Sequence, residues 1–348
     1  MNVLANRRRT VITVGSLAAA TALGVTVTVL PATADSGARD TGGHGLTHGD
    51  GHAAGHGSGT PSGAGTTEGA ATATGTSTVL AASLRGANEV PPASGAAVGD
   101  PDGGALLFLR VKGDKVSVAV KWHGVTPPTA LHIHDGVKGV NGAIEVDYTP
   151  LLGAARGNSL TATATVTVTD RTVLQRLRDD PAGFYANLHT AEFPGGAVRG
   201  QLHKVTAGVD FRHAPDSFQA SVVKGEQIYR CERNRAGGHS FAQRDVRAVL
   251  DGRIGHTFTR PGSGTPRWVA RDGSAVTGEV VGRTPNGAAN IPELDLRAKK
   301  SGKKQGLLAT TAEILRLNTT GGVAPAGSCV PGTVKGVPYG ADYVFVQR

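Results

Sequence analysis

The sequence has few of the residues that carry chemistry or build an aromatic core. Among its 348 residues are two cysteines, one methionine and two tryptophans, and aromatic residues make up 4%. Glycine, in contrast, occurs 51 times. This balance argues against a helix-rich enzyme and favours short strands joined by many turns. The length is sufficient for two domains, each with its own core.

Familiar catalytic motifs are also absent. The sequence has no GxSxG, HExxH or P-loop motif, and no GxGxxG motif directly after a strand-like segment. These absences remove the commoner hydrolases and nucleotide-dependent enzymes from consideration. Whether the protein is an enzyme is therefore left open by the sequence.

The N-terminal segment, residues 1–34, is typical of an export signal. Three arginines precede an apolar run at 11–30, and small residues at 32–34 form a cleavage site. The pair Arg8-Arg9 indicates the twin-arginine route, with the Sec route as the alternative. We expect a secreted protein whose mature chain begins near Asp35. The run is long enough to span a bilayer, so an uncleaved anchor is a further alternative, and no other segment could span.

Residues 35–78 predict a flexible, disordered linker. They are mostly Gly, Ala, Ser and Thr, and so cannot bury enough apolar surface to offset the entropy of ordering. The linker carries a histidine at every fourth position, although the interleaved glycines prevent a stable helix. Such a cluster could hold Zn, Cu or Ni loosely, or it is simply a solvated His-rich linker. Its members are His44, His48, His52 and His56.

The two cysteines, Cys231 and Cys329, predict a disulfide. In an exported protein an even pair is more often a disulfide than a reactive site. A structural zinc site needs four ligands, and the sequence has no CxxC spacing. In the chain-entropy model a bond that closes a loop of about 100 residues contributes about 4–5 kcal/mol.

The region 79–206 shows the alternation of apolar and polar residues that is typical of strands. One helix is expected at 170–180, capped by Thr169 or Asp170 and followed by Pro181. The spacing predicts an all-β fold, a Greek-key β-sandwich or barrel of about eight strands. We expect these strands at residues 79–86, 105–112, 115–122, 129–135, 143–149, 159–168, 184–190 and 197–203.

The region 216–348 predicts a second, mainly-β domain. Residues 207–348 hold 20 Lys and Arg against 12 Asp and Glu, whereas the two signs nearly balance in residues 79–206. The lysine-rich 299–304 is expected at a hairpin tip, where lysines usually mark a solvated turn or an edge protected from aggregation. The alternative is that the basic excess attracts acidic envelope polymers or polysaccharide as partners. Nucleic acid is not expected, because aromatic stacking platforms are lacking. Strands are expected at 226–232, 254–259, 274–282, 291–300, 307–317 and 341–347.

Three segments of the first region resemble the CHRD domain, the module first named for repeats in chordin. They are LRGANEVPP at 84–92, LHIHDGVKGVNGAIEV at 131–146 and FYANLHTAEFPGGAVRGQL at 184–202. Their order and extent cover most of residues 79–206. The resemblance implies a secreted β domain whose biochemical role is mostly unassigned.

A possible metal site follows from His132 and His134. Two positions apart on a strand, they share a face about 6–7 Å apart, and His189 from another strand would be a third nitrogen ligand. These elements are similar to the copper site of copper/zinc superoxide dismutases, which implies copper as the metal and Arg199 as an anion-guiding residue. No histidine occurs between His134 and His189, where that family places its bridging and zinc ligands.

Two alternatives to this site stay open. The histidines can be structural, bonded to the backbone and to carboxylates around the turn that follows His134, with His189 bonded beside Asn187 and Glu192. If a metal does bind, His123 or His203 could be the third ligand in place of His189.

The second region resembles a family of secreted bacterial and fungal proteins classified only as a domain of unknown function. The resembling segments are GEQIYRCE, RWVARDGSAVTGEVV, LNTTGGVAPAGSC and VPYGADYVFV. From the residues alone, His256, Trp268 and Asp272 could line a sugar-binding pocket with an aromatic wall. The alternative is a core tryptophan and an Asp-Gly-Ser turn.

Two functional hypotheses result. The first is a secreted or cell-wall-associated two-domain binding protein of unassigned ligand, expected to be a monomer. The second is a copper-binding redox protein or metal carrier that uses the CHRD-like domain. The two differ in whether the purified protein holds stoichiometric copper.

Overall fold

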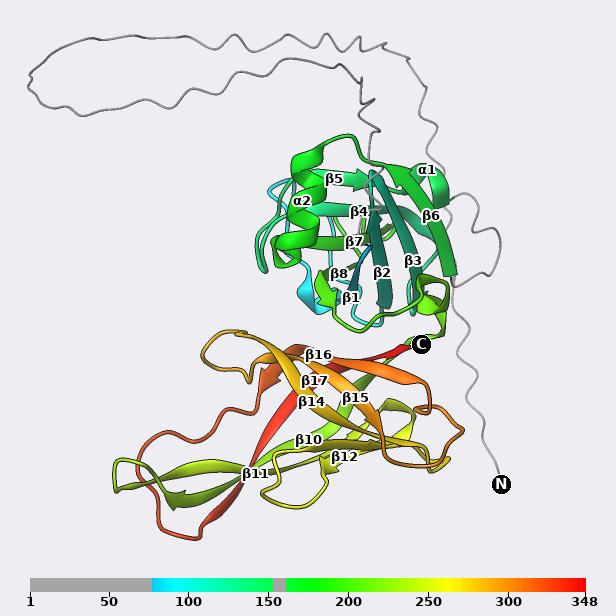
Figure 1. Ribbon diagram of the computed structural model, residues 1–348. Helices are drawn as coiled ribbons and strands as arrows, with labels where there is room; N and C mark the ends of the chain where they lie inside the picture. The colour runs from blue at the N-terminus through cyan, green and yellow to red at the C-terminus, as the bar shows by residue number, and fades with distance from the viewer. Residues whose placement is uncertain (1–76, 153–160) are drawn as a thin grey trace, which may run out of the picture. The chain divides into compact units, whose positions relative to one another are not determined.

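Two antiparallel β-sheets make up most of the regular structure in the computed structural model, which describes residues 77–152 and 161–348 (Figure 1). The all-β prediction is confirmed. The expected export signal and the linker histidines His44, His48, His52 and His56 lie outside the described residues. None of the helices in the described ranges is both long enough and apolar enough to cross a membrane.

The first sheet is antiparallel throughout and confirms the expected strands, the last of which is divided into two. The strand order is β5-β4-β7-β8-β1-β2-β3-β6, and β9 pairs with β1. Strands distant in sequence, such as β4 and β7, lie side by side, as a Greek-key connection requires. The strands are β1 (Thr78–Arg85), β2 (Gly104–Lys112), β3 (Lys115–His123), β4 (Pro128–Asp135), β5 (Ile144–Asp147), β6 (Thr161–Thr167), β7 (Phe184–Thr190), β8 (Val198–Gln201) and β9 (His203–Val205).

One face of this sheet forms the core of the first domain. Leu131 and Ile133 of β4 and Leu188 of β7 are fully buried in it. The hydroxyl of Tyr148, just after β5, donates a hydrogen bond to the carbonyl oxygen of Val116 in β3, at 3.1 Å. Because β5 and β3 lie near opposite ends of the strand order, the sheet curls around its core as a barrel does (Figure 1).

Helix α2 (Arg171–Asp179) is the helix predicted from the sequence. Asp170 caps it, since the carboxylate accepts hydrogen bonds from the backbone N–H groups of Thr172 and Val173. Its buried residues Val173 and Leu174, with Leu177, join the core. A second helix, α1 (Thr149–Leu152), follows β5 and was not predicted.

The second sheet is a closed eight-stranded barrel in which β10 pairs with β17. Short 3-10 turns punctuate the chain at Gly86–Asn88, Pro181–Gly183, Phe211–Asp216 and Asp251–Arg253. The barrel strands are β10 (Phe218–Arg233), β11 (His239–Leu250), β12 (Ile254–Phe258), β13 (Pro266–Val269), β14 (Ala275–Thr284), β15 (Glu293–Lys300), β16 (Thr311–Gly321) and β17 (Val334–Gln347).

Two of these strands, β11 and β13, were missed in the sequence. Apolar alternation in β11 is confined to its end, where Val246, Ala248 and Leu250 are buried, while the earlier part carries polar residues. Strand β13 has four residues and begins with Pro266, which argues against a strand on its own. The lysine-rich segment at 299–304 begins in the last two residues of β15 and continues into the connection between β15 and β16.

The predicted disulfide is present between Cys231 and Cys329. It joins β10 to the loop that precedes β17. The backbone supports the same contact, because Cys231 exchanges hydrogen bonds with Gly332 and Thr333. The bond therefore fastens the first strand of the barrel to a late loop.

Candidate functional site

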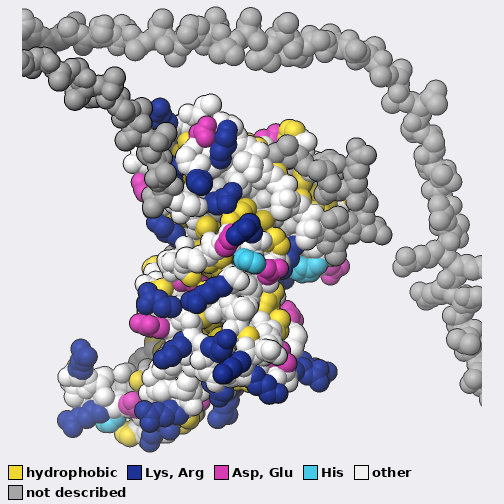
Figure 2. Space-filling model, turned by 45° about the vertical axis from the view of Figure 1, so that its right-hand side comes forward, with side chains coloured by type: hydrophobic (Ala, Val, Ile, Leu, Met, Phe, Trp, Pro, Cys, Tyr) yellow, Lys and Arg dark blue, Asp and Glu magenta, His cyan; other side chains and the backbone are white. Residues whose placement is uncertain are grey.

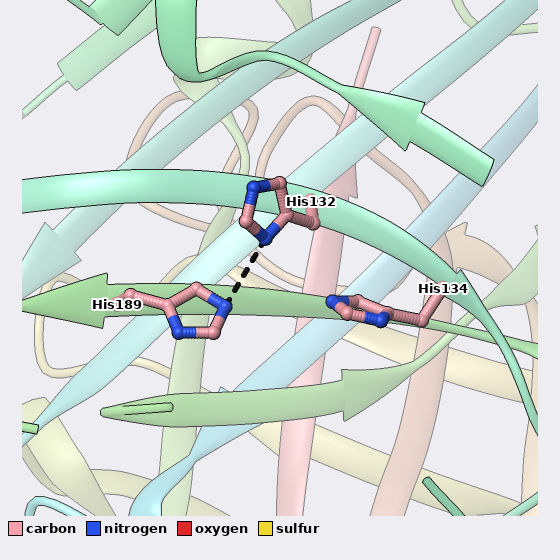
Figure 3. A group of neighbouring side chains, drawn as sticks. All are labelled: His132, His134 and His189. Atoms are coloured by element: carbon pink, nitrogen blue, oxygen red, sulfur yellow. Dashed lines mark hydrogen bonds between the residues drawn. The ribbon is translucent and has the colours of Figure 1, made fainter. Parts of the chain in front are cut away.

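The candidate site lies on the face of the first sheet opposite the core. His132 and His134 alternate along β4 with Leu131 and Ile133, so their rings point away from the buried face. Strand β7 runs antiparallel beside β4 and places His189 opposite Ala130, on the same face. Figure 3 shows the three rings gathered over the two strands.

The three histidines converge. Each offers one ring nitrogen, and the three nitrogens lie within 4.8 Å of one another. Nδ1 of His132 is 3.2 Å from Nε2 of His189 (Figure 3). Two nitrogens on one tetrahedral ion, each about 2.0–2.1 Å from it, would be about 3.4 Å apart. Small ring rotations would therefore bring the three nitrogens to coordinating distances.

The outward nitrogens of His134 and His189 are held by backbone carbonyls. Nδ1 of His134 lies 3.1 Å from the Gly142 oxygen, and Nδ1 of His189 lies 3.0 Å from the Pro194 oxygen. Because a carbonyl can only accept, both Nδ1 atoms carry the proton, and in the neutral rings both Nε2 atoms keep a lone pair. Nε2 of His134 is buried and has no hydrogen-bond partner within the described ranges.

His132 is oriented in the opposite sense, with Nδ1 toward the other rings. Its Nε2 lies 3.1 Å from Oγ1 of Thr149 and 3.4 Å from a carboxylate oxygen of Asp147. Metal-bound imidazoles commonly donate their second N–H to a carboxylate or carbonyl, which fixes the ring and its tautomer. All three rings thus have such a partner on the nitrogen that faces away from the cluster.

The alternative that the histidines are structural predicts hydrogen bonds to the backbone and to carboxylates. The structure shows such contacts on only one nitrogen of each ring. The backbone and carboxylate contacts exist, but they use the outer nitrogens and leave the inner ones directed at one another. His189 bonds to Pro194 and not beside Glu192. His123 and His203, the alternative third ligands, are not part of this group.

Burial keeps these rings neutral. It lowers the pKa of His134 to about 4, and it also lowers the pKa of His132 and His189. The neighbouring imidazoles act in the same direction on His132 and His134. At neutral pH the inner nitrogens of His134 and His189 therefore hold free lone pairs, and the inner nitrogen of His132 becomes a ligand when its proton moves to Nε2, because a metal binds the unprotonated nitrogen.

Arg199, expected to guide an anion, is only 2% exposed. Its guanidinium donates to the carbonyl oxygens of Val137 and Val140 and to the side-chain oxygen of Asn141. It also stacks on Tyr185, 3.4 Å from the ring centroid. Arg199 therefore holds the loop that carries Gly142, and this position does not support a role in attracting anions from solvent.

Two further residues near the site were missed in the sequence. Tyr185 stacks on His134 at 4.8 Å with nearly parallel rings. Glu89, from the turn after β1, accepts a hydrogen bond from Asn187, which pairs with His132 across the strands. Burial raises the pKa of Glu89 to about 8 against the opposing effects of Arg199 and Asn187, so this carboxyl is largely protonated at pH 7. The sequence NEVPP, which contains Glu89, predicted a turn but gave no sign of the contact between Glu89 and Asn187.

The structure brings together two of the three residues of the pocket predicted in the second domain and places the third, Asp272, elsewhere. His256 and Trp268 stack at 4.4 Å inside the barrel and line a cavity of about 170 Å³. Asp272 is not among the lining residues, because its carboxylate accepts hydrogen bonds from Ser274 and Leu307 in a turn. Trp268 is also part of the barrel core, and Asp272 lies in a turn, as expected from the alternative of a core tryptophan and an Asp-Gly-Ser turn.

Comparisons with known families match both domains. The family model of the CHRD domain matches residues 80–202, and that of a protein of unknown function, DUF3455, matches residues 247–347, which leaves β10 outside the match. No curated protein and no solved structure is significantly similar to the chain. The three histidines and their partners fall inside the first match, and the chain thus carries a CHRD domain followed by a domain of the DUF3455 family.

Proposed function

We propose that the CHRD domain binds one transition-metal ion through His132, His134 and His189. The observation that carries the proposal is the convergence of three inner nitrogens within 4.8 Å, with the outer nitrogens already bonded. Three imidazoles leave at least one coordination position open. A bound ion could therefore take up a small ligand, and the same site would serve a carrier or a redox centre.

Copper(II) is the proposed ion. Imidazole nitrogens suit both copper and zinc, but copper(II) stands higher in the affinity order for a nitrogen site. The site contains no thiolate that would favour a closed zinc centre. The relation to superoxide dismutases is limited to this copper-type ligand set, because the bridging and zinc ligands have no counterpart in the sequence.

Calorimetric titration with copper(II) and zinc(II) tests the proposal. The full chain is used with His44, His48, His52 and His56 all replaced by alanine, so that the linker cannot contribute. One ion per chain is expected, with copper tighter than zinc. Replacing His134 by alanine should weaken copper binding by about 100-fold or more, since one of three ligands is lost. His213→Ala, an exposed histidine, is the matched control. Equal binding by the His134 variant would show that the histidines are structural.

A second candidate function is binding of acidic polymers by the second barrel. Lys299, Lys300, Lys303 and Lys304 are all exposed, and Lys and Arg side chains gather on this barrel in Figure 2. We propose that this surface retains the protein on acidic polysaccharide. Release is expected by about 0.3–0.5 M salt, where the Debye length is about 4–6 Å. Unchanged retention after replacement of the four lysines by glutamine would contradict the proposal.

A further inference from the structure

The interior of the second barrel contains a cavity that its side chains do not fill. Eight strands enclose a space just wide enough for side chains or for one small ligand. Here about 170 Å³ remains, and exposed Gln243, Gly264 and Arg283 lie among its lining residues. A cavity of about 150 Å³ is large enough for benzene. The space therefore suits a ligand with a single ring.

The walls of the cavity combine polar groups with an aromatic cluster and aliphatic side chains. Trp268, Tyr343 and His256 contribute rings from three different strands, with ring centroids 4.4–5.5 Å apart. Leu296 and Val280 add aliphatic surface. Gly278 lets Trp268 and Leu296 pack closely against β14, because a Cβ at this position would lie 3.0 Å from the Trp268 ring. Such walls favour a flat apolar body in the ligand.

The buried polar atoms of the cavity that lack a hydrogen-bond partner are all donors. The side-chain nitrogens Nε2 of Gln227, Nε1 of Trp268 and Nε of Arg316 are buried and have no hydrogen-bond partner among the described residues. Leaving a buried donor unpaired is costly, so buried polar groups are normally satisfied. A ligand that supplies acceptor oxygens would satisfy them.

The charge inside the cavity is positive. Arg316 is 9% exposed and donates through Nη2 to the carbonyl oxygen of Pro292, at 2.7 Å. No aspartate or glutamate lines the cavity, and within the described ranges Arg316 forms no salt bridge. A buried guanidinium without a carboxylate partner is unusual, and its planar donor edge matches a carboxylate.

From the donors, the charge and the size together, we infer that the second barrel binds a small aromatic carboxylate, with its ring among Trp268 and Tyr343 and its carboxylate on Arg316. This site is separate from the histidine site of the CHRD domain. It differs from the sugar pocket predicted from the sequence in its ligand, because a neutral sugar would leave the guanidinium charge unpaired.

Titration with benzoate tests the inference. The protein has two tryptophans, so Trp122→Phe leaves Trp268 as the only indole, and its fluorescence reports the cavity directly. Benzoate should bind with a dissociation constant of about 1 mM or tighter, as a ligand of this size allows. Benzyl alcohol, which has the ring without the charge, and acetate, which has the charge without the ring, should each bind at least about tenfold more weakly.

The variant Arg316→Met should weaken benzoate about 10- to 100-fold and leave benzyl alcohol nearly unchanged, because only a charge-assisted hydrogen bond is lost. Arg297→Met, on the exposed side of β15, is the matched control. If Arg316→Met does not fold, the affinities of the protein with Arg316 intact for benzoate and for benzyl alcohol still test the inference. Equal affinity for these two compounds, or no effect of benzoate on Trp268, would overturn the inference.

Discussion

The two domains use the two faces of a curled sheet in opposite ways. The CHRD domain fills its interior mainly with aliphatic side chains and places the three histidines of the site on the outer face, where loops hold them. The second barrel places an aromatic stack, an arginine and a cavity in its interior. The difference teaches that two sheets with similar strand counts and antiparallel pairing can place their binding groups on opposite faces. The position of a site depends on which face of the sheet carries the polar side chains.

The two tryptophans allow this comparison to be tested, because each domain contains one. Trp122 lies in the core of the CHRD domain and Trp268 in the core of the second barrel. Trp122→Phe and Trp268→Phe therefore give two proteins in which fluorescence follows one domain at a time. The predictions on stability use these two reporters.

Loss of the disulfide should have the largest effect. Replacing Cys231 and Cys329 by serine should lower the free energy of unfolding of the second barrel by about 4 kcal/mol, because the unfolded chain is no longer closed into a long loop. Urea unfolding followed through Trp268 measures this change. If the unfolding transition followed through Trp122 keeps its midpoint, the two domains unfold separately, and equal shifts of both transitions would show that they unfold as one unit.

The pH dependence of the second barrel should reflect His256. Burial lowers its pKa to about 3, with the Arg267 carbonyl bond opposing and Arg316 adding to the effect. Between pH 6.5 and pH 4 the unfolded chain binds a proton there and the folded chain does not. The free energy of unfolding should therefore fall on acidification, by about 1.4 kcal/mol per pH unit below pH 6. His256→Gln should flatten this slope in the Trp268 signal alone; an unchanged slope would contradict the assignment.

A smaller effect is expected from the carboxylate beside the histidine site. Asp147→Asn should weaken copper binding about tenfold, because the residue that holds the outer nitrogen of His132 loses its charge. Calorimetry on the variant without linker histidines measures it. Asp114→Asn, an exposed aspartate in the same domain, should have no effect, and equal affinities of the two variants would argue against Asp147 as an orienting group.

The smallest predicted effect concerns the cap of α2. Asp170→Ala should lower the free energy of unfolding of the CHRD domain by about 1 kcal/mol, because two backbone N–H groups lose their acceptor. The Trp122 signal should register the change. Asp179→Ala, at the other end of the helix, removes a negative charge from the C-terminus and should not destabilise the domain.

The sequence predicted the histidine site better than the cavity, for a physical reason. His132 and His134 lie two positions apart on one strand, so their common face follows from strand geometry alone. Asp147 and Gly142 hold the rings through strand register and loop shape, which no local pattern contains. The cavity residues come from strands between 227 and 343, two of them with little apolar alternation, so only the closed barrel brings them together.

The outward hydrogen bonds of the three imidazoles have a consequence for charge balance. His134 and His189 already keep their protons on the outer side, and His132 needs only to move its proton from Nδ1 to Nε2, toward Asp147, to free its inner nitrogen. A divalent ion bound there would displace no proton into solvent and would meet three neutral ligands. It would keep its full double charge, so the open coordination position would favour a small anion over water.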